Sequence, residues 1–358
     1  MLNQLANKEH WKSNFLEIYK SIKADKIIYG LIIIFSITVT IIANLNGYDT
    51  KSQLTGYLLL LPTVLQLSFI IGSIGYFIVL VYRKEKRPLY CFWQQIIFFY
   101  EQRYQIISAF LLLVVISVFS SYYSTFKAMI PVLHPFEFDE SLRQMDLWLF
   151  LGNEPWRLIH NLYQSPWVTL GLDFAYNVWF FLVYGVLITF LVTQNGQNRR
   201  RYVLAWLLCW IVIGNLLALL FSSVGPTFIG RLAPDHTSYE PLMALLHQQD
   251  RWIQQHVPSL LIWSLNTQDS LWTSYSTGKE MLGSGISAMP SMHVSMSVLM
   301  ALGVGSINRK LGIIFWCFSF IIYIGSFTLG WHYAVDGLVS GPITVVIWYL
   351  CGSKSILR

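Results

Sequence analysis

The sequence predicts an all-α polytopic membrane protein, a bundle of about eight transmembrane helices. Of its 358 residues, 55% are apolar and only 12% are charged, whereas an ordinary soluble domain carries roughly 25% charged residues. Eight apolar runs are each long enough, at about 20 residues, to cross ~30 Å of hydrocarbon. The basic residues concentrate in alternate connections between these runs. A water-soluble globule is excluded, and with no basic groove a nucleic acid is not expected as a partner.

The first apolar run is a retained helix rather than a signal peptide. It follows a polar segment of 26 residues and has no small-residue cleavage site. That segment, 1–26, mixes lysines with apolar residues at helical spacing and suits an amphipathic helix on the cytoplasmic membrane surface. The eight predicted spans are Ile27 to Leu45, Tyr57 to Tyr82, Ile106 to Phe126, Leu170 to Thr193, Tyr202 to Ser222, Met289 to Ser306, Leu311 to Leu329 and Ala334 to Leu350.

Lysine and arginine counts indicate the orientation, because basic residues accumulate in cytoplasmic loops. Seventeen of the 24 basic residues lie on the side of the two termini, and seven lie on the other side, although the loops there are longer. Both termini are therefore expected in the cytoplasm. The long loops 127–169 and 223–288 are then outside, and the second is expected to cover the outer surface with a short helix near Glu240 to His256.

The cysteines and histidines form no recognisable metal or redox motif. The four cysteines include no CxxC pair, and no Cys/His cluster has the spacing of metal ligands. No carboxylate cluster has the spacing that magnesium needs. We therefore expect neither a metal nor a cofactor.

Two short stretches place ionisable residues at the ends of predicted spans, where such residues are costly unless they have a function. Ser287-Ala-Met-Pro-Ser-Met-His293 opens the sixth span, and Gly330-Trp-His-Tyr-Ala-Val-Asp336 lies at the turn into the eighth. By the charge count both stretches lie at the outer face. The two histidines can therefore converge on one site.

The residues in these stretches favour anion binding and nucleophilic chemistry. Pro290 suits the first turn of a helix, which would place Ser291 and His293 where free backbone N–H groups attract an anion. His332 and Asp336 are four residues apart and share a helix face. The carboxylate can then accept the imidazole N–H and leave the other nitrogen as a nucleophile or general base. Haem ligation by the two histidines is the rival functional idea, and it explains neither the PSMH stretch nor the aspartate.

Together the two stretches resemble the type 2 phosphatidic acid phosphatase superfamily. Pro290-Ser-Met-His293 is similar to its second signature, P-S-G-H, and Gly330 to Asp336 resembles its third, in which His and Asp are four residues apart. The resemblance implies a six-helix phosphatase-type core at 106–358. Two additional transmembrane helices and a cytoplasmic loop, at 27–105, would precede that core.

The sequence also departs from this family. The first signature, K-x6-R-P, is missing after the fifth span, where the chain reads Ser222 to Arg231 without it. The Ser-Arg pair of the third signature is replaced by Gly325 and Ser326. These losses, with the acidic stretch Asp139 to Asp146, resemble the inositol phosphorylceramide synthase and sphingomyelin synthase branch. That branch transfers phospho-headgroups between lipids.

The resemblance implies a catalytic role for three residues. His332 would attack phosphorus, Asp336 would stabilise the imidazolium that develops, and His293 would protonate the leaving oxygen. Water or an acceptor hydroxyl would then resolve the phosphohistidine.

The resemblance also implies a set of substrate-binding candidates. Ser291 and the adjacent N–H groups would hold nonbridging oxygens, and Ser326 is a further candidate. Arg231 is the candidate for the missing cation, with anchoring to headgroups as the alternative. Asp173 and Asn177 could line an acceptor site, although helix packing is the favoured interpretation of that pair.

These expectations combine into a functional hypothesis. The chain would act on a phospholipid or isoprenoid phosphate at the outer membrane face, with a lipid alcohol as possible acceptor. Because a diester carries one negative charge and the chain offers few cations, headgroup transfer is favoured over plain hydrolysis of phosphatidate or polyprenyl pyrophosphate. A transporter or membrane scaffold is the non-enzymatic alternative. The absence of N-x-[ST] acceptors favours a bacterial inner membrane over a eukaryotic one.

Overall fold

A computed structural model describes residues 19–20, 22–48, 51–193, 196–278 and 283–353 of the chain. Within these ranges the secondary structure is helical, with no strand. Seven helices of the described part are long and apolar enough to cross a membrane. The predicted class, an all-α polytopic membrane bundle, is therefore confirmed.

The membrane-spanning helices follow the predicted order. An eighth apolar helix, α14, is shorter than the other seven, with 16 residues. The fifth span is built from three consecutive pieces, of which the middle one is a π-helix. The spanning elements are α2 (Lys26–Leu45), α3 (Lys51–Tyr82), α5 (Arg103–Leu133), α8 (Pro166–Thr193), α9 (Gln197–Leu208) with η1 (Cys209–Leu217) and α10 (Ala218–Leu220), α14 (Met292–Ile307), α15 (Arg309–Thr328) and α16 (Ala334–Cys351).

The start of α14 corrects the predicted position of Pro290. Ser291 is the N-cap of this helix, and its Oγ accepts a hydrogen bond from Val294 N at 3.4 Å. Pro290 therefore precedes the cap instead of occupying the first turn. A capping serine sets the helix start because its side chain satisfies a backbone N–H that has no partner within the helix.

Helix α14 lies among α8, α15, α16 and η1, and packs most extensively on α15. The α14–α15 crossing is close because both helices present glycine to each other. A Cβ on Gly312 would lie 2.5 Å from Gly305 Cα, so the backbones meet as small residues allow in membrane bundles. This contact lies near the C-terminal end of α14, whereas His293 lies near its start.

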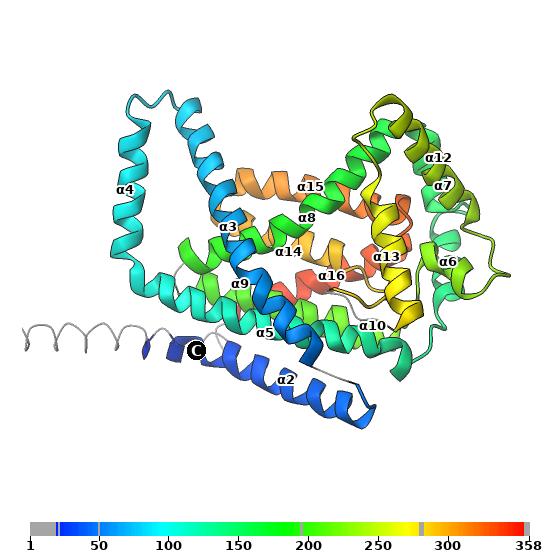
Figure 1. Cartoon of the computed structure of the whole chain (residues 1–358), viewed down its shortest axis with the longest axis horizontal. Coiled ribbons are helices and arrows are strands. Elements are labelled where there is room, and N and C mark those ends of the chain that lie inside the picture. The colour runs from blue at the N-terminus through cyan, green and yellow to red at the C-terminus, as the bar shows by residue number, and fades with distance from the viewer. Residues whose placement is uncertain (1–18, 21, 49–50, 194–195, 279–282, 354–358) are drawn as a thin grey trace, which may run out of the picture.

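Short helices gather at one end of the bundle, on the right in Figure 1. One of them, α12, covers the residues for which a helix was expected. Between the spans lie α6 (Asp139–Leu149), α7 (Pro155–Tyr163), α11 (Pro226–Leu232), α12 (Glu240–His256) and α13 (Trp263–Thr277). The long connections are thus helical layers over the bundle end.

The third span extends further than the sequence predicts. The apolar run ends at Phe126, but α5 continues to Leu133. Met129 and Ile130 are fully buried against α2 residues such as Val39 and Ala43. Packing of these side chains extends the helix past Lys127, which the charge count had placed in a loop.

The opposite end of the bundle carries α4 (Pro88–Glu101), in a stretch expected to be a cytoplasmic loop. In Figure 1 this helix stands across the direction of the spans, at the left edge. None of its residues is buried in the protein, and its exposed side chains include Leu89, Trp93 and Tyr100. Exposed apolar residues of this kind are typical of an interfacial helix.

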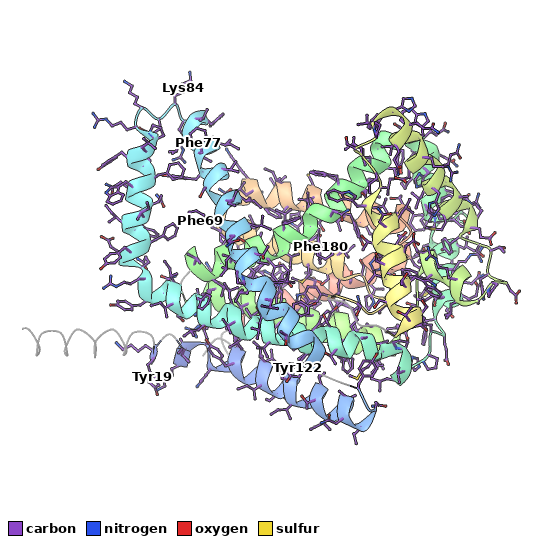
Figure 2. The ribbon with its side chains drawn as sticks, viewed as in Figure 1. Tyr19, Phe69, Phe77, Lys84, Tyr122 and Phe180 are labelled. Atoms are coloured by element: carbon purple, nitrogen blue, oxygen red, sulfur yellow. The ribbon has the colours of Figure 1, made fainter. Side chains whose placement is uncertain are left out.

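The two N-terminal helices pack on α5. Tyr57 on α3 makes a hydrogen bond of 2.5 Å between its hydroxyl and Ser124 Oγ on α5. Asp25, just before α2, forms a buried ion pair with Arg199 on α9. The outer face of α3 is apolar, and Figure 2 shows Phe69 and Phe77 extending away from the bundle. The amphipathic helix expected at 1–26 lies almost entirely outside the described residues.

Candidate active site

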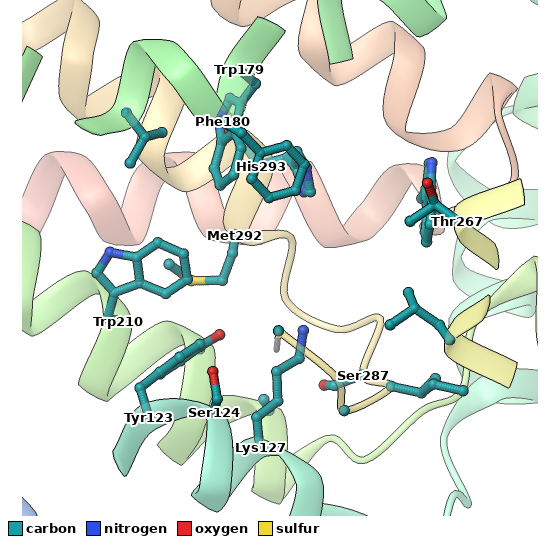
Figure 3. A pocket seen from close by; sticks show the side chains of 18 of the residues that line it. Tyr123, Ser124, Lys127, Trp179, Phe180, Trp210, Thr267, Ser287, Met292 and His293 are labelled. Atoms are coloured by element: carbon teal, nitrogen blue, oxygen red, sulfur yellow. The ribbon is translucent and has the colours of Figure 1, made fainter. Parts of the chain in front are cut away.

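A cavity of about 360 Å³ lies between the spans, and residues of α11 and α13 form part of its lining. Both predicted histidines line it, together with Lys127 of α5 (Figure 3). Aromatic and apolar residues of α5, α8 and the fifth span make up much of the remaining lining. They are Phe119, Tyr123, Tyr176, Trp179, Phe180, Val183, Tyr184, Trp206 and Trp210.

His332 is held by two acceptors on a single ring nitrogen. Its Nδ1 lies 2.7 Å from the Ala288 carbonyl oxygen and 3.2 Å from Asp336 Oδ2. Because a carbonyl oxygen can only accept, Nδ1 carries the hydrogen. In the neutral ring Nε2 is then unprotonated and has the lone pair of a nucleophile.

Asp336 connects the segments around the site. Its carboxylate accepts from Tyr333 N at 3.1 Å, in a capping box that starts α16. Its backbone oxygen accepts from Ser291 N at 3.3 Å. One fully buried residue therefore fixes the His332 turn and the start of α14 relative to each other.

His293 is held between aromatic rings on α8. Its imidazole stacks on Tyr176 with ring centroids 4.0 Å apart, and Trp179 lies at the same distance on a tilted ring. Trp179 Nε1 also donates to the His293 carbonyl at 2.9 Å. His293 Nε2 has no protein partner among the described residues. The ring centroids of His293 and His332 are 6.3 Å apart, so the two imidazoles lie close together at the cavity.

The substrate-binding candidates Ser291 and Ser326 lie next to the site but do not line the cavity. Both are fully buried. Ser291 Oγ caps α14, as described above. Ser326 donates its hydroxyl to Tyr323 O at 2.7 Å, and its carbonyl accepts from the backbone N–H groups of Trp331 and His332, each at 3.0 Å. In the structure these serines shape the backbone around the histidines.

Arg231 is not brought into the cavity. It lies at the end of α11 and forms an ion pair of 2.6 Å with Asp269 of α13. The described lining instead contains Lys127 as its one lysine, and it contains no arginine. Sequence reasoning missed this lysine because the apolar run stops one residue before it.

Asp139 and Asp146 of α6 were singled out in sequence only as part of an acidic stretch. Asp146 accepts from Ala334 N and Val335 N, both at 2.8 Å, at the start of α16. Asp139 accepts from Val224 N, from Gly225 N and from the Tyr333 hydroxyl at 2.8 Å.

Both aspartates of α6 are buried, at 4% and 2% exposure. Burial raises the pKa of Asp139, and it raises that of Asp146 to about 7, although N–H donors favour the carboxylate. The two carboxyls fix the turn that carries His332. Their spacing before the fourth span was the signal available in sequence.

Asp173 and Asn177, the two residues considered for a site that binds the acceptor lipid, have different roles in the structure. Asp173 accepts from the backbone N–H groups of Trp263 and Ser264, each at 2.9 Å, and thereby holds the start of α13. Asn177 lines the cavity and donates to the Asp173 carbonyl at 2.8 Å. For Asp173 the packing interpretation fits these contacts. In the described part of the chain, no three His, Cys, Asp or Glu residues lie together as a metal site would require.

Comparison with known proteins gives one match. The sequence model of the PAP2 superfamily matches residues 140–350, which include α8, α14, the His332 turn and α16 but not α5. Searches of curated proteins and of solved structures found no match.

Proposed function

The chain belongs to the PAP2 superfamily, which in general comprises phosphatases, and from this premise we propose that it transfers a lipid phospho-headgroup through a phosphohistidine on His332. Its seven apolar helices make it an integral multi-pass membrane protein. Superfamily and helices together support a membrane lipid phosphatase in general. The observation that carries the finer proposal is the His332 ring, whose Nδ1 is bound to Ala288 O and Asp336 while its other nitrogen remains for the cavity.

The first step forms a bond between His332 Nε2 and phosphorus. The bond from phosphorus to the leaving oxygen breaks, and His293 gives that oxygen a proton. Asp336 balances the positive charge that develops on the His332 ring. Aromatic packing on Tyr176 and Trp179 fixes the orientation of the His293 ring.

The second step reverses these roles. An acceptor hydroxyl gives its proton to His293 as its oxygen attacks phosphorus, and the bond to His332 Nε2 breaks. Water in place of the alcohol would give hydrolysis. The aromatic lining of the cavity favours an acceptor with apolar character, such as a lipid alcohol, because the apolar surface of the acceptor leaves water when it enters the cavity.

Charge in the cavity favours a phosphodiester substrate. A phosphate monoester approaches two negative charges at pH 7, whereas a diester carries one. The described lining supplies one lysine and no arginine. Headgroup transfer from a diester is thus the proposed reaction. The charge count supports an outer-face location with both termini in the cytoplasm.

The test is a set of lipid assays on the purified full chain. Labelled phosphatidic acid, polyprenyl pyrophosphate and a phospholipid diester are each supplied with and without ceramide or diacylglycerol. We expect alcohol-dependent headgroup transfer from the diester, and an acid-labile label on the protein during turnover.

Variants assign the two histidines. His332→Ala and His293→Ala should each lower turnover by ~10³-fold or more, while His247→Ala, at an exposed position on α12, should not. His332→Ala should also abolish the acid-labile label. Near-normal turnover in either site variant would overturn that assignment, and phosphate release without any headgroup transfer would leave a plain lipid phosphatase. Lipid flux without chemistry would indicate a transporter.

A further inference from the structure

Lys127 lies on α5, outside the part of the chain that the superfamily model matches. Its side chain extends into the cavity between Ser124 and Ser287, as Figure 3 shows. The same cavity is lined by His293 and His332. The cavity therefore contains a cation together with the two histidines proposed to carry out the reaction.

The charge of Lys127 has no ionic partner in the part of the chain that the structure describes. Among the described residues, no carboxylate lies within ion-pair distance of it. The lysine is partly buried, inside a helix that spans the membrane. Taking an ammonium out of water without a counter-charge is unfavourable, so charged residues at such positions mark ligand or ion sites.

The loop before α14 is shaped to fit against this lysine. A Cβ on Gly285 would lie 3.0 Å from the Lys127 carbonyl carbon and 3.1 Å from its Cγ, and Gly285 has φ of +112°. Glycine is the residue that permits both this backbone angle and this approach. The loop therefore packs on the lysine stem and leaves the ammonium to the cavity.

Arg231, the cation expected from the sequence, is already in an ion pair. Arg231 pairs with Asp269 at 2.6 Å and lies outside the lining. The first signature of the superfamily, which would supply a lysine and an arginine, is missing. On these observations we propose that Lys127 binds the phosphate group of the substrate lipid, replacing the missing signature cations from a different helix; this rests on the proposed function.

This assignment makes Lys127 a specificity-determining residue. A single ammonium matches the single charge of a phosphodiester and leaves a monoester dianion incompletely compensated. The lysine also lies where its charge can attract the nonbridging oxygens as His332 attacks. Its loss should therefore weaken binding of phosphate lipids and leave binding of neutral lipids unchanged.

The experiment measures binding in the absence of turnover. Full-length His332→Ala protein in nanodiscs is titrated with fluorescent phosphatidylglycerol and with fluorescent diacylglycerol, which lacks phosphate. Lys127→Met, added to this background, should weaken phosphatidylglycerol binding by about 10- to 100-fold, the range expected for a lost charged hydrogen bond. Diacylglycerol binding should not change. Lys127→Arg should recover most of the affinity, because it restores the charge.

A matched control removes a different positive charge. Arg251→Met, at an exposed position on α12, should leave both titrations unchanged. Lys127→Met replaces the lysine by an apolar side chain of similar length, so it should fold, and its thermal stability is measured alongside.

The outcomes separate the two proposals. Unchanged phosphatidylglycerol affinity in Lys127→Met, or an equal loss for both lipids, would overturn the role of Lys127. Loss of affinity in Arg231→Met with normal Lys127→Met binding would return the role to Arg231 and also overturn it. Because the titration needs no reaction, a lysine-dependent result stands even if His332→Ala shows normal turnover in the separate assay, which would overturn the phosphohistidine alone.

Discussion

Ala288 contributes a backbone carbonyl to His332, and this contact decides which ring nitrogen is free. The carbonyl is closer to Nδ1 than Asp336 is, at 2.7 Å against 3.2 Å. In a Ser-His-Asp triad the carboxylate alone holds the tautomer, and its replacement by an amide costs ~10⁴ in kcat. Here the Ala288 carbonyl also fixes the tautomer, so the main role of the Asp336 carboxylate is to stabilise the positive charge of the imidazolium.

Asp336→Asn separates these two roles. We expect kcat to fall by about 10²-fold, less than in the triad, because Ala288 still fixes the proton on Nδ1. KM should change little, since Asp336 does not line the cavity. Steady-state headgroup transfer and thermal unfolding are measured together, with the exposed Asp235→Asn as control. A loss of 10⁴-fold with unchanged unfolding would mean that Ala288 does not hold the tautomer.

Local spacing made part of the site predictable at this scale. His332 and Asp336 meet, as their spacing predicts, but His332 precedes the N-cap of α16, so the contact crosses the capping turn and not a helix face. Lys127 could not be found in this way. Its neighbours in the cavity come from α8, α14 and the loop before α14, and tertiary packing alone brings them together. Arg231 was nominated by its place in the chain, but packing of α11 near α13 pairs it with Asp269.

Helix α6 supports the turn that carries His332. Its two buried aspartates accept backbone N–H groups from α16 and from the segment before α11. Carboxylates at a helix N-terminus satisfy unpaired N–H groups and oppose the positive end of the helix dipole. Helix α6 therefore holds the His332 turn in place without lining the cavity.

The Asp146 contact predicts a pH dependence of stability. Burial raises its folded pKa to about 7, above the ordinary value of 3.8. The folded protein therefore holds this proton more tightly than the unfolded chain does. The resulting stabilisation is complete below about pH 4 and is lost as the pH rises through about 7.

Asp146→Asn removes the titration but keeps an acceptor. The Tm of the wild type relative to this variant should fall between about pH 5 and pH 7.5 and then level off. Thermal unfolding in detergent across this range measures the difference. A wild-type Tm that keeps a constant distance from the variant Tm would contradict the raised pKa. A wild-type Tm that rises relative to the variant Tm as the pH increases would mean that the pKa of Asp146 is lowered on folding.

Hydropathy located the spans but not the elements that connect them. The helix Glu240–His256 was expected, whereas α4 and the continuation of α5 to Leu133 were not. The end of α5 depends on packing against α2, a surface outside its own sequence. The π-helix in the fifth span likewise has no local signal. It passes Tyr123 and Met292 so closely that a Cβ on Gly214 would lie 2.9 Å from the tyrosine ring.

The whole molecule has two different ends. Helices α6, α7, α12 and α13 cover the end nearest the cavity, and α4 lies at the other (Figure 1). Figure 2 shows Lys84, in the basic connection before α4, at the tip of the α3–α4 pair. The basic-residue count predicts that the cavity end faces the outside.

Cysteine labelling tests this orientation. Cysteines replacing Thr237 and Ser276, both exposed at the cavity end, should react with an impermeant maleimide added to intact cells. A cysteine replacing exposed Asn198, at the start of α9, should react only after the membrane is opened. Cys91 and Cys317, which are not buried, are first changed to serine. The reverse pattern would place both histidines in the cytoplasm and change the available substrates.

The buried pair of Asp25 and Arg199 bears on how the chain is assembled during synthesis. The two residues are 174 positions apart, so the ribosome completes four helical spans before the arginine emerges. Until then the aspartate has no Arg199 to neutralise it, and the first helix lacks its link to α9. The link between the first helix and α9 is therefore a late event, and a nascent chain released before the fifth span would have α2 packed on α5 with Asp25 still lacking this partner.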